Sequence, residues 1–199
     1  MKVRNAMRTE LPRQMVHLSG IIFVIFAQFI GREMTVIYFS LITLFFFIYS
    51  WYVRTQEKKL ENFLGKFESR LRDFTLKFER KHVKNPFTGA MFFYLGCTLA
   101  FVFFPFSIAS AACAMLAVGD ALSTLVGENL GKRKIGSKTF EGFAACFLGS
   151  VAGGIFFASP FITVIGALTA SFAELIPGID DNLTIPILAG LVMFLATLV

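Results

Sequence analysis

Seven continuous apolar stretches divide this chain, and they constrain its fold more than any other feature. Several are close to about 17 residues, the shortest helix that crosses the hydrocarbon core of a bilayer. The chain is 56% hydrophobic and 16% charged, which argues against a water-soluble enzyme and against a disordered chain. We therefore expect an all-α, polytopic membrane protein with about seven transmembrane helices in a single membrane-embedded catalytic domain, residues 1–199. The stretches are residues 15–30, 34–53, 87–104, 107–126, 140–158, 161–176 and 183–199.

The distribution of Lys and Arg predicts how the chain is oriented. If the N-terminus is cytoplasmic, only Arg32 of the 19 Lys and Arg residues falls on the outer side, as the positive-inside rule requires. This orientation accounts for the formal net charge of +6 without a nucleic-acid partner. We expect a multi-pass protein of the cell membrane whose acidic residues, apart from Glu33, lie on or near the cytoplasmic side.

Residues 54–84 carry apolar side chains at alternating steps of four and three, the spacing of an amphipathic helix. The stretch is rich in cations, so we expect a cytoplasmic amphipathic helical insert that lies on an anionic membrane surface or covers the site. An ordinary packing helix fits the pattern equally well, and the stretch itself shows no chemistry.

The stretch with the greatest potential for chemistry is GDALSTLVGENLGKRKIGSKTFEG, residues 119–142. Glycine lets backbone approach a phosphate closely, Lys and Arg neutralise it, and carboxylates hold the Mg²⁺ that accompanies a nucleotide. A helix that opens at Thr139 and Glu141 would add N–H groups that favour an anion. The charges alone fit a cytoplasmic loop with turn glycines better, but a carboxylate within a membrane span, Asp120, favours a functional site. GKRKIGSK, residues 131–138, is not a Walker A loop, because Ser-Lys stands in place of Lys-Ser/Thr and an apolar helix precedes it.

A second polar group precedes the last span. Glu174 is followed by PGIDDNLTIP, in which the adjacent carboxylates of Asp180 and Asp181, with Asn182 beside them, suit a divalent cation. The alternative is that Asp181 or Asn182 caps the last helix, and both roles can coexist.

A third group lies at the cytoplasmic mouth of the first span. Arg13 and His17 are spaced i, i+4 and therefore share one helical face. Arg13 alone is more typical of a membrane-interface anchor. His17 is harder to explain in that way, because the chain has only two histidines.

Three stretches together resemble the CTP-dependent polyprenol kinases, the family of dolichol kinase, phytol kinase and the CTP-dependent diacylglycerol kinase. They are LPRQMVHLSG, the glycine- and lysine-rich residues 119–142, and AELIPGIDDNLTIPILAGL. The KTFEG segment also resembles the phosphatidate cytidylyltransferases. The chain lacks their glycine- and histidine-rich signature near the C-terminus and has PGIDDN there, so the kinase resemblance is preferred.

The resemblance implies transfer of the γ-phosphate of CTP to the hydroxyl of a membrane lipid alcohol, with Mg²⁺ as cofactor and the site facing the cytoplasm. The alcohol would be of the polyprenol or dolichol type, or a diacyl or diether glycerol. Two alternatives stay open: a cytidylyltransferase that makes a CDP-activated lipid, and a small transporter or non-catalytic membrane subunit.

The resemblance also implies roles for single residues. Asp120 would hold Mg²⁺ or accept the hydroxyl proton, and sequence does not separate these roles. The expected catalytic residues are Asp120, Lys138 and Glu141; the expected metal ligands are Asp120, Asp180 and Asp181; the expected CTP contacts are Arg13, His17, Gly119, Gly127, Gly131, Lys132, Lys134, Lys138, Thr139 and Asn182.

Overall fold

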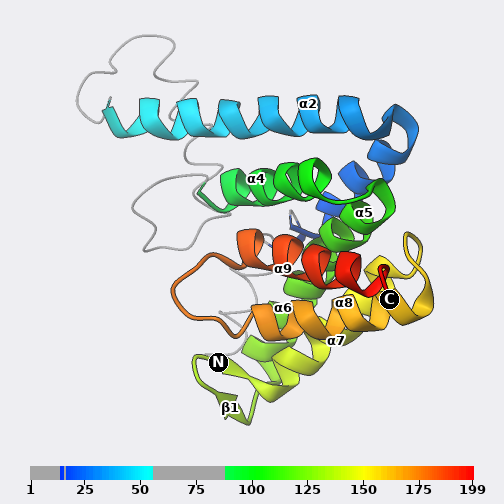
Figure 1. The fold of residues 1–199 in the computed structure, drawn as a ribbon. Coiled ribbons are helices and arrows are strands. Elements are labelled where there is room, and N and C mark those ends of the chain that lie inside the picture. The colour runs from blue at the N-terminus through cyan, green and yellow to red at the C-terminus, as the bar shows by residue number, and fades with distance from the viewer. Residues whose placement is uncertain (1–13, 16, 56–87) are drawn as a thin grey trace.

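The computed structural model describes residues 14–15, 17–55 and 88–199. Arg13 and all but the first two residues of the expected amphipathic insert, residues 54–84, lie outside this part of the chain. The described part is almost entirely helical, as expected, with one short β-hairpin (Figure 1). The elements are α2 (Gly20–Thr55), α4 (Thr88–Phe103), α5 (Phe106–Met115), the π-helical turn η1 (Leu116–Asp120), α6 (Ala121–Leu130), β1 (Lys134–Ile135), β2 (Lys138–Thr139), α7 (Phe140–Gly154), α8 (Pro160–Ala173) and α9 (Asp181–Ala196).

Helices cover each of the seven apolar stretches, so their predicted positions are confirmed. By length and composition, two helical segments are able to cross a membrane, Gly20–Trp51 and Phe106–Leu130. The helices α4, α7, α8 and α9 are apolar but only 10–17 residues long. An arrangement of seven spans goes beyond this observation and belongs to the proposal made below.

A kink at Gly31 separates the first two apolar stretches within α2, where a loop was expected. The φ of +79° and ψ of 174° at Gly31 belong to a region that residues with a side chain rarely adopt. The neighbouring Arg32 donates hydrogen bonds of 2.8 Å to the carbonyls of Phe101 and Val102. Because these carbonyls belong to the last turn of α4, the Arg32 cation is favourable there and ties the kink to the end of that helix.

The helices form a layered bundle around one central segment. Figure 1 shows α2, α4, α9 and α8 running roughly along one direction, and each packs against the next. The continuous segment from α5 through η1 to α6 is the most enclosed. Of its most apolar part, 72% is buried inside the bundle, compared with 11% for α2. The helix α7 approaches this segment closely, since a Cβ added at Gly153 would lie 2.7 Å from the carbonyl oxygen of Ala114.

One end of the bundle gathers most of the polar connections. The loop between α8 and α9 and the start of α4 lie at this end, whereas the turns between α4 and α5 and between α7 and α8 lie at the other (Figure 1). Residues 127–138 lie between two of the predicted apolar stretches, and only part of them forms a loop. The helix α6 continues to Leu130, and residues 134–139 form an antiparallel hairpin that pairs Lys134 with Thr139.

Large apolar side chains cover the outside of the bundle. Exposed examples on α2 include Phe29 at 82% and Trp51 at 64% of full exposure, and Phe156, which follows α7, is 84% exposed. A soluble monomer rarely exposes contiguous apolar patches beyond a few hundred Å². The exposed apolar side chains are therefore consistent with a lipid environment.

Candidate functional site

Three carboxylates from distant parts of the chain come together at the polar end of the bundle. Asp120 ends the π-helical turn η1, Glu174 follows the last residue of α8, and Asp181 begins α9. One ligand-capable atom of each lies within 4.8 Å of those of the other two. Because opposite oxygen ligands of Mg²⁺ are about 4.2 Å apart, small side-chain movements would let this carboxylate cluster enclose a divalent cation.

The π-helical turn sets the direction of Asp120. One extra residue in a helical turn re-aims the side chains around it, and such turns are frequent at functional sites. Gly119, directly before Asp120, packs so closely on α7 that an added Cβ would collide with the hydroxyl of Ser150. Close helix packing therefore explains why residue 119 is a glycine. A role of Gly119 in holding phosphate stays a prediction.

Glu174 is the most deeply buried member of the cluster, with 2% of the residue exposed. Its Oε1 accepts hydrogen bonds from the hydroxyl of Ser123, one turn after Asp120, and from Nζ of Lys138 at 3.0 Å. Its Oε2 is buried and has no hydrogen-bond partner among the residues that the structure describes. A buried oxygen without a partner is costly, so a cation or donor at this point would be strongly favoured.

Lys138, from strand β2, supplies the cation of the site. Its Nζ lies 3.0 Å from Oε1 of Glu174 and 2.8 Å from Oδ2 of Asp181, and 30% of its side chain is exposed. Burial by itself lowers the pKa of Lys138, but the two carboxylates outweigh it and hold the pKa above its usual range. Lys138 therefore stays a cation over the whole physiological pH range.

Asp181 differs from an ordinary surface carboxylate, although it precedes the apolar part of α9, which starts at Leu183. Burial raises the pKa of Asp181 to about 6, against the opposing effect of the hydrogen bond from Lys138. Asp120 and Glu174 also contribute to this rise, because like charges nearby disfavour ionisation. Three carboxylates thus lie close together with a single lysine among them.

His17, which lies three residues before α2, contacts the site. Its Nε2 lies 2.6 Å from Oδ1 of Asn182 and 3.3 Å from Oδ2 of Asp120. The amide of Asn182 is oriented by Asp180, whose Oδ1 accepts from both the backbone N and Nδ2 of Asn182 at 3.0 and 2.8 Å. Since Oδ1 of Asn182 only accepts, the assigned tautomer of His17 carries its proton on Nε2 and donates.

Asp180, not Asp181 or Asn182, is the N-cap of α9, because its side chain accepts from the backbone N of Asn182. The prediction of the capping residue was therefore wrong by one or two positions. Asp180 is outside the three-carboxylate cluster, and its role as a metal ligand remains a prediction.

The position of Asn182 depends on a glycine of the neighbouring helix. An added Cβ at Gly96 of α4 would collide with the carbonyl oxygen of Asn182 and come within 2.9 Å of Pro186. Only glycine therefore allows the start of α9 to approach α4 this closely. From the same helix, Phe93 packs edge-on against His17 with ring centroids 5.1 Å apart.

The remaining predicted residues shape the hairpin next to the carboxylate cluster. Thr139 is the N-cap of α7 and accepts from the backbone N of Gly142 at 3.1 Å, which confirms that a helix opens here. Glu141 accepts from the backbone N–H groups of Lys132 and Arg133 at 3.0 and 3.2 Å and thereby fixes the entry to the hairpin. These contacts give Glu141 a structural role, and its expected catalytic role stays a prediction.

Glycines and exposed cations complete the hairpin. Gly127 and Gly131 lie against the side chain of Thr139, so close packing accounts for both. The side chains of Lys132 and Lys134 are exposed. These two lysines face solvent near the site, and their contact with a triphosphate stays a prediction.

The structure thus brings together five of the predicted residues: His17, Asp120, Lys138, Asp181 and Asn182. Sequence reasoning included Glu174 in the second candidate group without naming it as a ligand, and it overlooked Ser123. The signal for Ser123 was its i, i+3 spacing from Asp120, which places both on one helical face.

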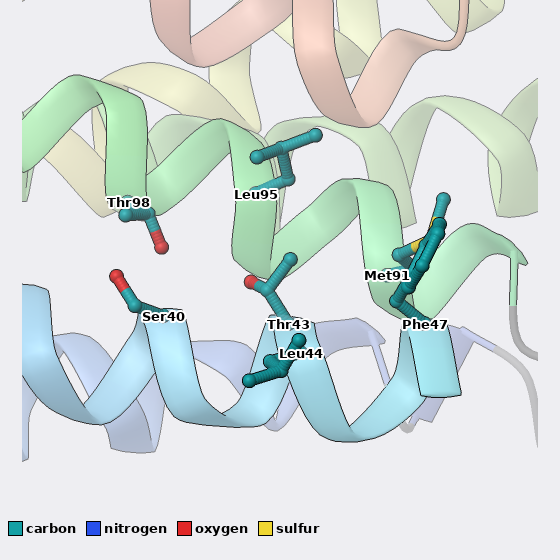
Figure 2. Close-up of a pocket in the computed structure, with 7 residues that line it drawn as sticks. All are labelled: Ser40, Thr43, Leu44, Phe47, Met91, Leu95 and Thr98. Atoms are coloured by element: carbon teal, nitrogen blue, oxygen red, sulfur yellow. The ribbon is translucent and has the colours of Figure 1, made fainter. Parts of the chain in front are cut away.

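A separate apolar pocket lies between α2 and α4 (Figure 2). Figure 2 shows Ser40 and Thr98 at one end of the pocket and Phe47 and Met91 at the other. None of its lining residues is ionisable, so this pocket does not suit a nucleotide. The lining residues are Ser40, Thr43, Leu44, Phe47, Met91, Leu95 and Thr98.

Comparison with known proteins finds one distant relative. The chain is 26% identical over 188 residues to an uncharacterized protein of Rickettsia prowazekii (strain Madrid E), covering 89% of this chain and 90% of that protein. No protein-family model matches the chain. No solved structure matches it either.

Proposed function

We propose that this protein is a CTP-dependent lipid kinase that transfers the γ-phosphate of CTP to the hydroxyl of a membrane lipid alcohol. One observation carries the proposal: the three stretches that resemble the polyprenol kinases each contribute to a single cluster. His17 comes from the first stretch, Asp120 and Lys138 from the second, and Glu174 and Asp181 from the third. Residues spread over most of the chain thus meet where a nucleotide and its metal would bind.

The chemistry of the cluster suits phosphoryl transfer. In this reaction the lipid hydroxyl oxygen forms a bond to the γ-phosphorus, the bond between that phosphorus and the β–γ bridging oxygen breaks, and CDP leaves. Catalysis of this kind depends on positioning and on neutralising charge. Glu174 and Asp181 would hold Mg²⁺, which supplies charge neutralisation at the phosphates, and Asp120 would either join these ligands or accept the hydroxyl proton. Lys138 would contact the phosphates.

The membrane part of the proposal rests on sequence and surface together. Helices occupy all seven apolar stretches, and α2 and other helices expose large apolar side chains. We propose that all seven cross the bilayer, with the carboxylate cluster and the basic hairpin on the cytoplasmic side, where CTP is available. A lipid alcohol would then reach the cluster from the bilayer.

The test is a transfer assay with the purified full-length protein in lipid–detergent micelles. CTP labelled at the γ-phosphate is incubated with Mg²⁺ and, in parallel, with a polyprenol, dolichol, a diacylglycerol and a diether glycerol. We expect label in one lipid, one CDP released per lipid phosphorylated, loss of transfer with EDTA, and a lower rate with ATP.

Two results would contradict the proposal. Release of pyrophosphate together with cytidine in the lipid fraction, when lipid phosphates are supplied, would identify the cytidylyltransferase alternative. Absence of any CTP-dependent product with the whole panel would favour the transporter or non-catalytic subunit.

A further inference from the structure

Lys138 occupies the place among the carboxylates that a cation would take. Its Nζ contacts Oε1 of Glu174 and Oδ2 of Asp181 at 3.0 and 2.8 Å, and Asp120 belongs to the same cluster. The second, independent observation is Oε2 of Glu174, which is buried and has no partner among the described residues. The cluster therefore has more acceptor capacity than Lys138 uses.

We infer that Lys138 is a built-in counter-cation that competes with a divalent metal ion for Glu174 and Asp181, so that metal binding and release of the Lys138 side chain are one event. This inference rests on the proposed function, since it describes how that site would be loaded. It gives Lys138 two positions, one among the carboxylates and one directed at phosphate.

The distances indicate that a metal ion and the Lys138 ammonium group would compete for the same oxygens. Mg²⁺ lies about 2.1 Å from its oxygen ligands. Since Nζ is 2.8 Å from Oδ2 of Asp181, a metal bound to that oxygen would lie within about 5 Å of the ammonium group. Two cations this close on the same carboxylate oxygens would repel each other, and the flexible lysine is the one that moves.

The position of Lys138 in the chain permits that movement. Its side chain is 30% exposed, whereas that of Glu174 is 1% exposed, so lysine has a path to solvent that Glu174 lacks. Strand β2 is two residues long and pairs with β1. Lys134 of β1 and Lys132, which precedes β1, are both exposed. A released Lys138 side chain would extend into solvent, where a triphosphate could contact it.

The experiment measures Mn²⁺ binding to the full-length protein in detergent, without CTP or lipid, by electron paramagnetic resonance of free Mn²⁺. Because a charge at this distance shifts an ionisation equilibrium by about one to three units, Lys138→Met should bind Mn²⁺ at least about tenfold more tightly than wild type. Lys134→Met removes the same charge from an exposed position of the same hairpin and should change the affinity by less than about twofold. Glu174→Gln should abolish the binding.

A second measurement uses the wild-type protein alone, in case Lys138→Met does not fold. Acetylation by a water-soluble N-hydroxysuccinimide ester is followed residue by residue by mass spectrometry, with Lys134 as the internal reference. Saturating Mn²⁺ should accelerate acetylation of Lys138 severalfold and leave Lys134 unchanged.

Other outcomes overturn either the inference or the proposed function, and the two failures are distinguishable. Equal or weaker Mn²⁺ binding by Lys138→Met, or acetylation of Lys138 that Mn²⁺ leaves unchanged, would show that lysine and metal do not compete. Absence of Mn²⁺ binding in a wild-type protein that still transfers phosphate from CTP would remove the metal site from the cluster and leave the proposed function standing. Competition between Lys138 and Mn²⁺ without any CTP-dependent transfer would leave the metal site standing and remove the proposed function.

Discussion

Nε2 of His17 lies 2.6 Å from Oδ1 of Asn182, although 165 residues separate the two in sequence. Asp180 holds the amide of Asn182 in place, and His17 also reaches Asp120 at 3.3 Å. The contact therefore ties the first helical segment to the start of α9 directly above the carboxylate cluster. A change to either residue should therefore affect the same site, although the two lie in distant parts of the chain.

The first prediction is that His17 and Asn182 act as a pair. His17→Ala and Asn182→Ala should each lower kcat/KM for CTP, and the double variant should lose little more than either single variant. Residues joined by one hydrogen bond show coupling energies of about 0.5–3 kcal/mol in such cycles. The measurement is a double-mutant cycle on CTP-dependent lipid phosphorylation; purely additive losses would show that the contact does not position the site.

The second prediction concerns Gly96. Gly96→Ala should lower activity and thermal stability, because the added methyl group pushes the start of α9 and Asn182 away from α4. The matched control is Gly89→Ala in the same helix, where nothing lies within 4 Å of an added Cβ. Alanine is favoured over glycine in a helix by about 1 kcal/mol, so the control should be neutral or slightly stabilising. If both variants behave alike in melting and turnover, the close approach of α9 is unimportant.

The third prediction concerns orientation in the membrane. A cysteine placed at Lys134 should react with an impermeant maleimide only from the cytoplasmic side, and one placed at Glu33 only from outside. The three native cysteines, Cys97, Cys113 and Cys146, are all buried, so they should give little background. Labelling in sealed vesicles of both orientations provides the measurement. Reaction of position 134 from the outer side would separate the site from cytoplasmic CTP.

The helices were predicted well from the sequence because long, continuous apolar runs of this kind form helices. Hydropathy and its periodicity do not reveal the local backbone conformation. Local conformation accounts for the differences between the predicted and the observed elements. Gly31 kinks α2 through a glycine-only conformation, and α6 runs on to Leu130 because its residues are compatible with a helix although they are polar. The hairpin of residues 134–139 is too short for any alternating pattern to show.

The site was predicted in part because its chemistry is concentrated in three short stretches. His17, Asp120, Lys138, Asp181 and Asn182 were all identified and do come together. Glu174 was not named as a ligand because a single acidic residue at a helix end is ordinary. Its pairing with Ser123 and Lys138 arises only when α6, α8 and the hairpin pack, and no spacing within one stretch indicates that contact.

The central claim is that the carboxylate cluster is where phosphate passes from CTP to a lipid. The most direct measurement compares transfer of labelled γ-phosphate by wild type, Asp120→Asn and the control Glu33→Gln, an exposed carboxylate near the Gly31 kink. Asn is nearly isosteric with Asp, so Asp120→Asn should fold normally but lose at least about 10²–10³-fold in rate, as with single electrostatic groups elsewhere. Glu33→Gln should keep the wild-type rate. An Asp120→Asn protein that melts like wild type and retains more than half of its activity would contradict the account.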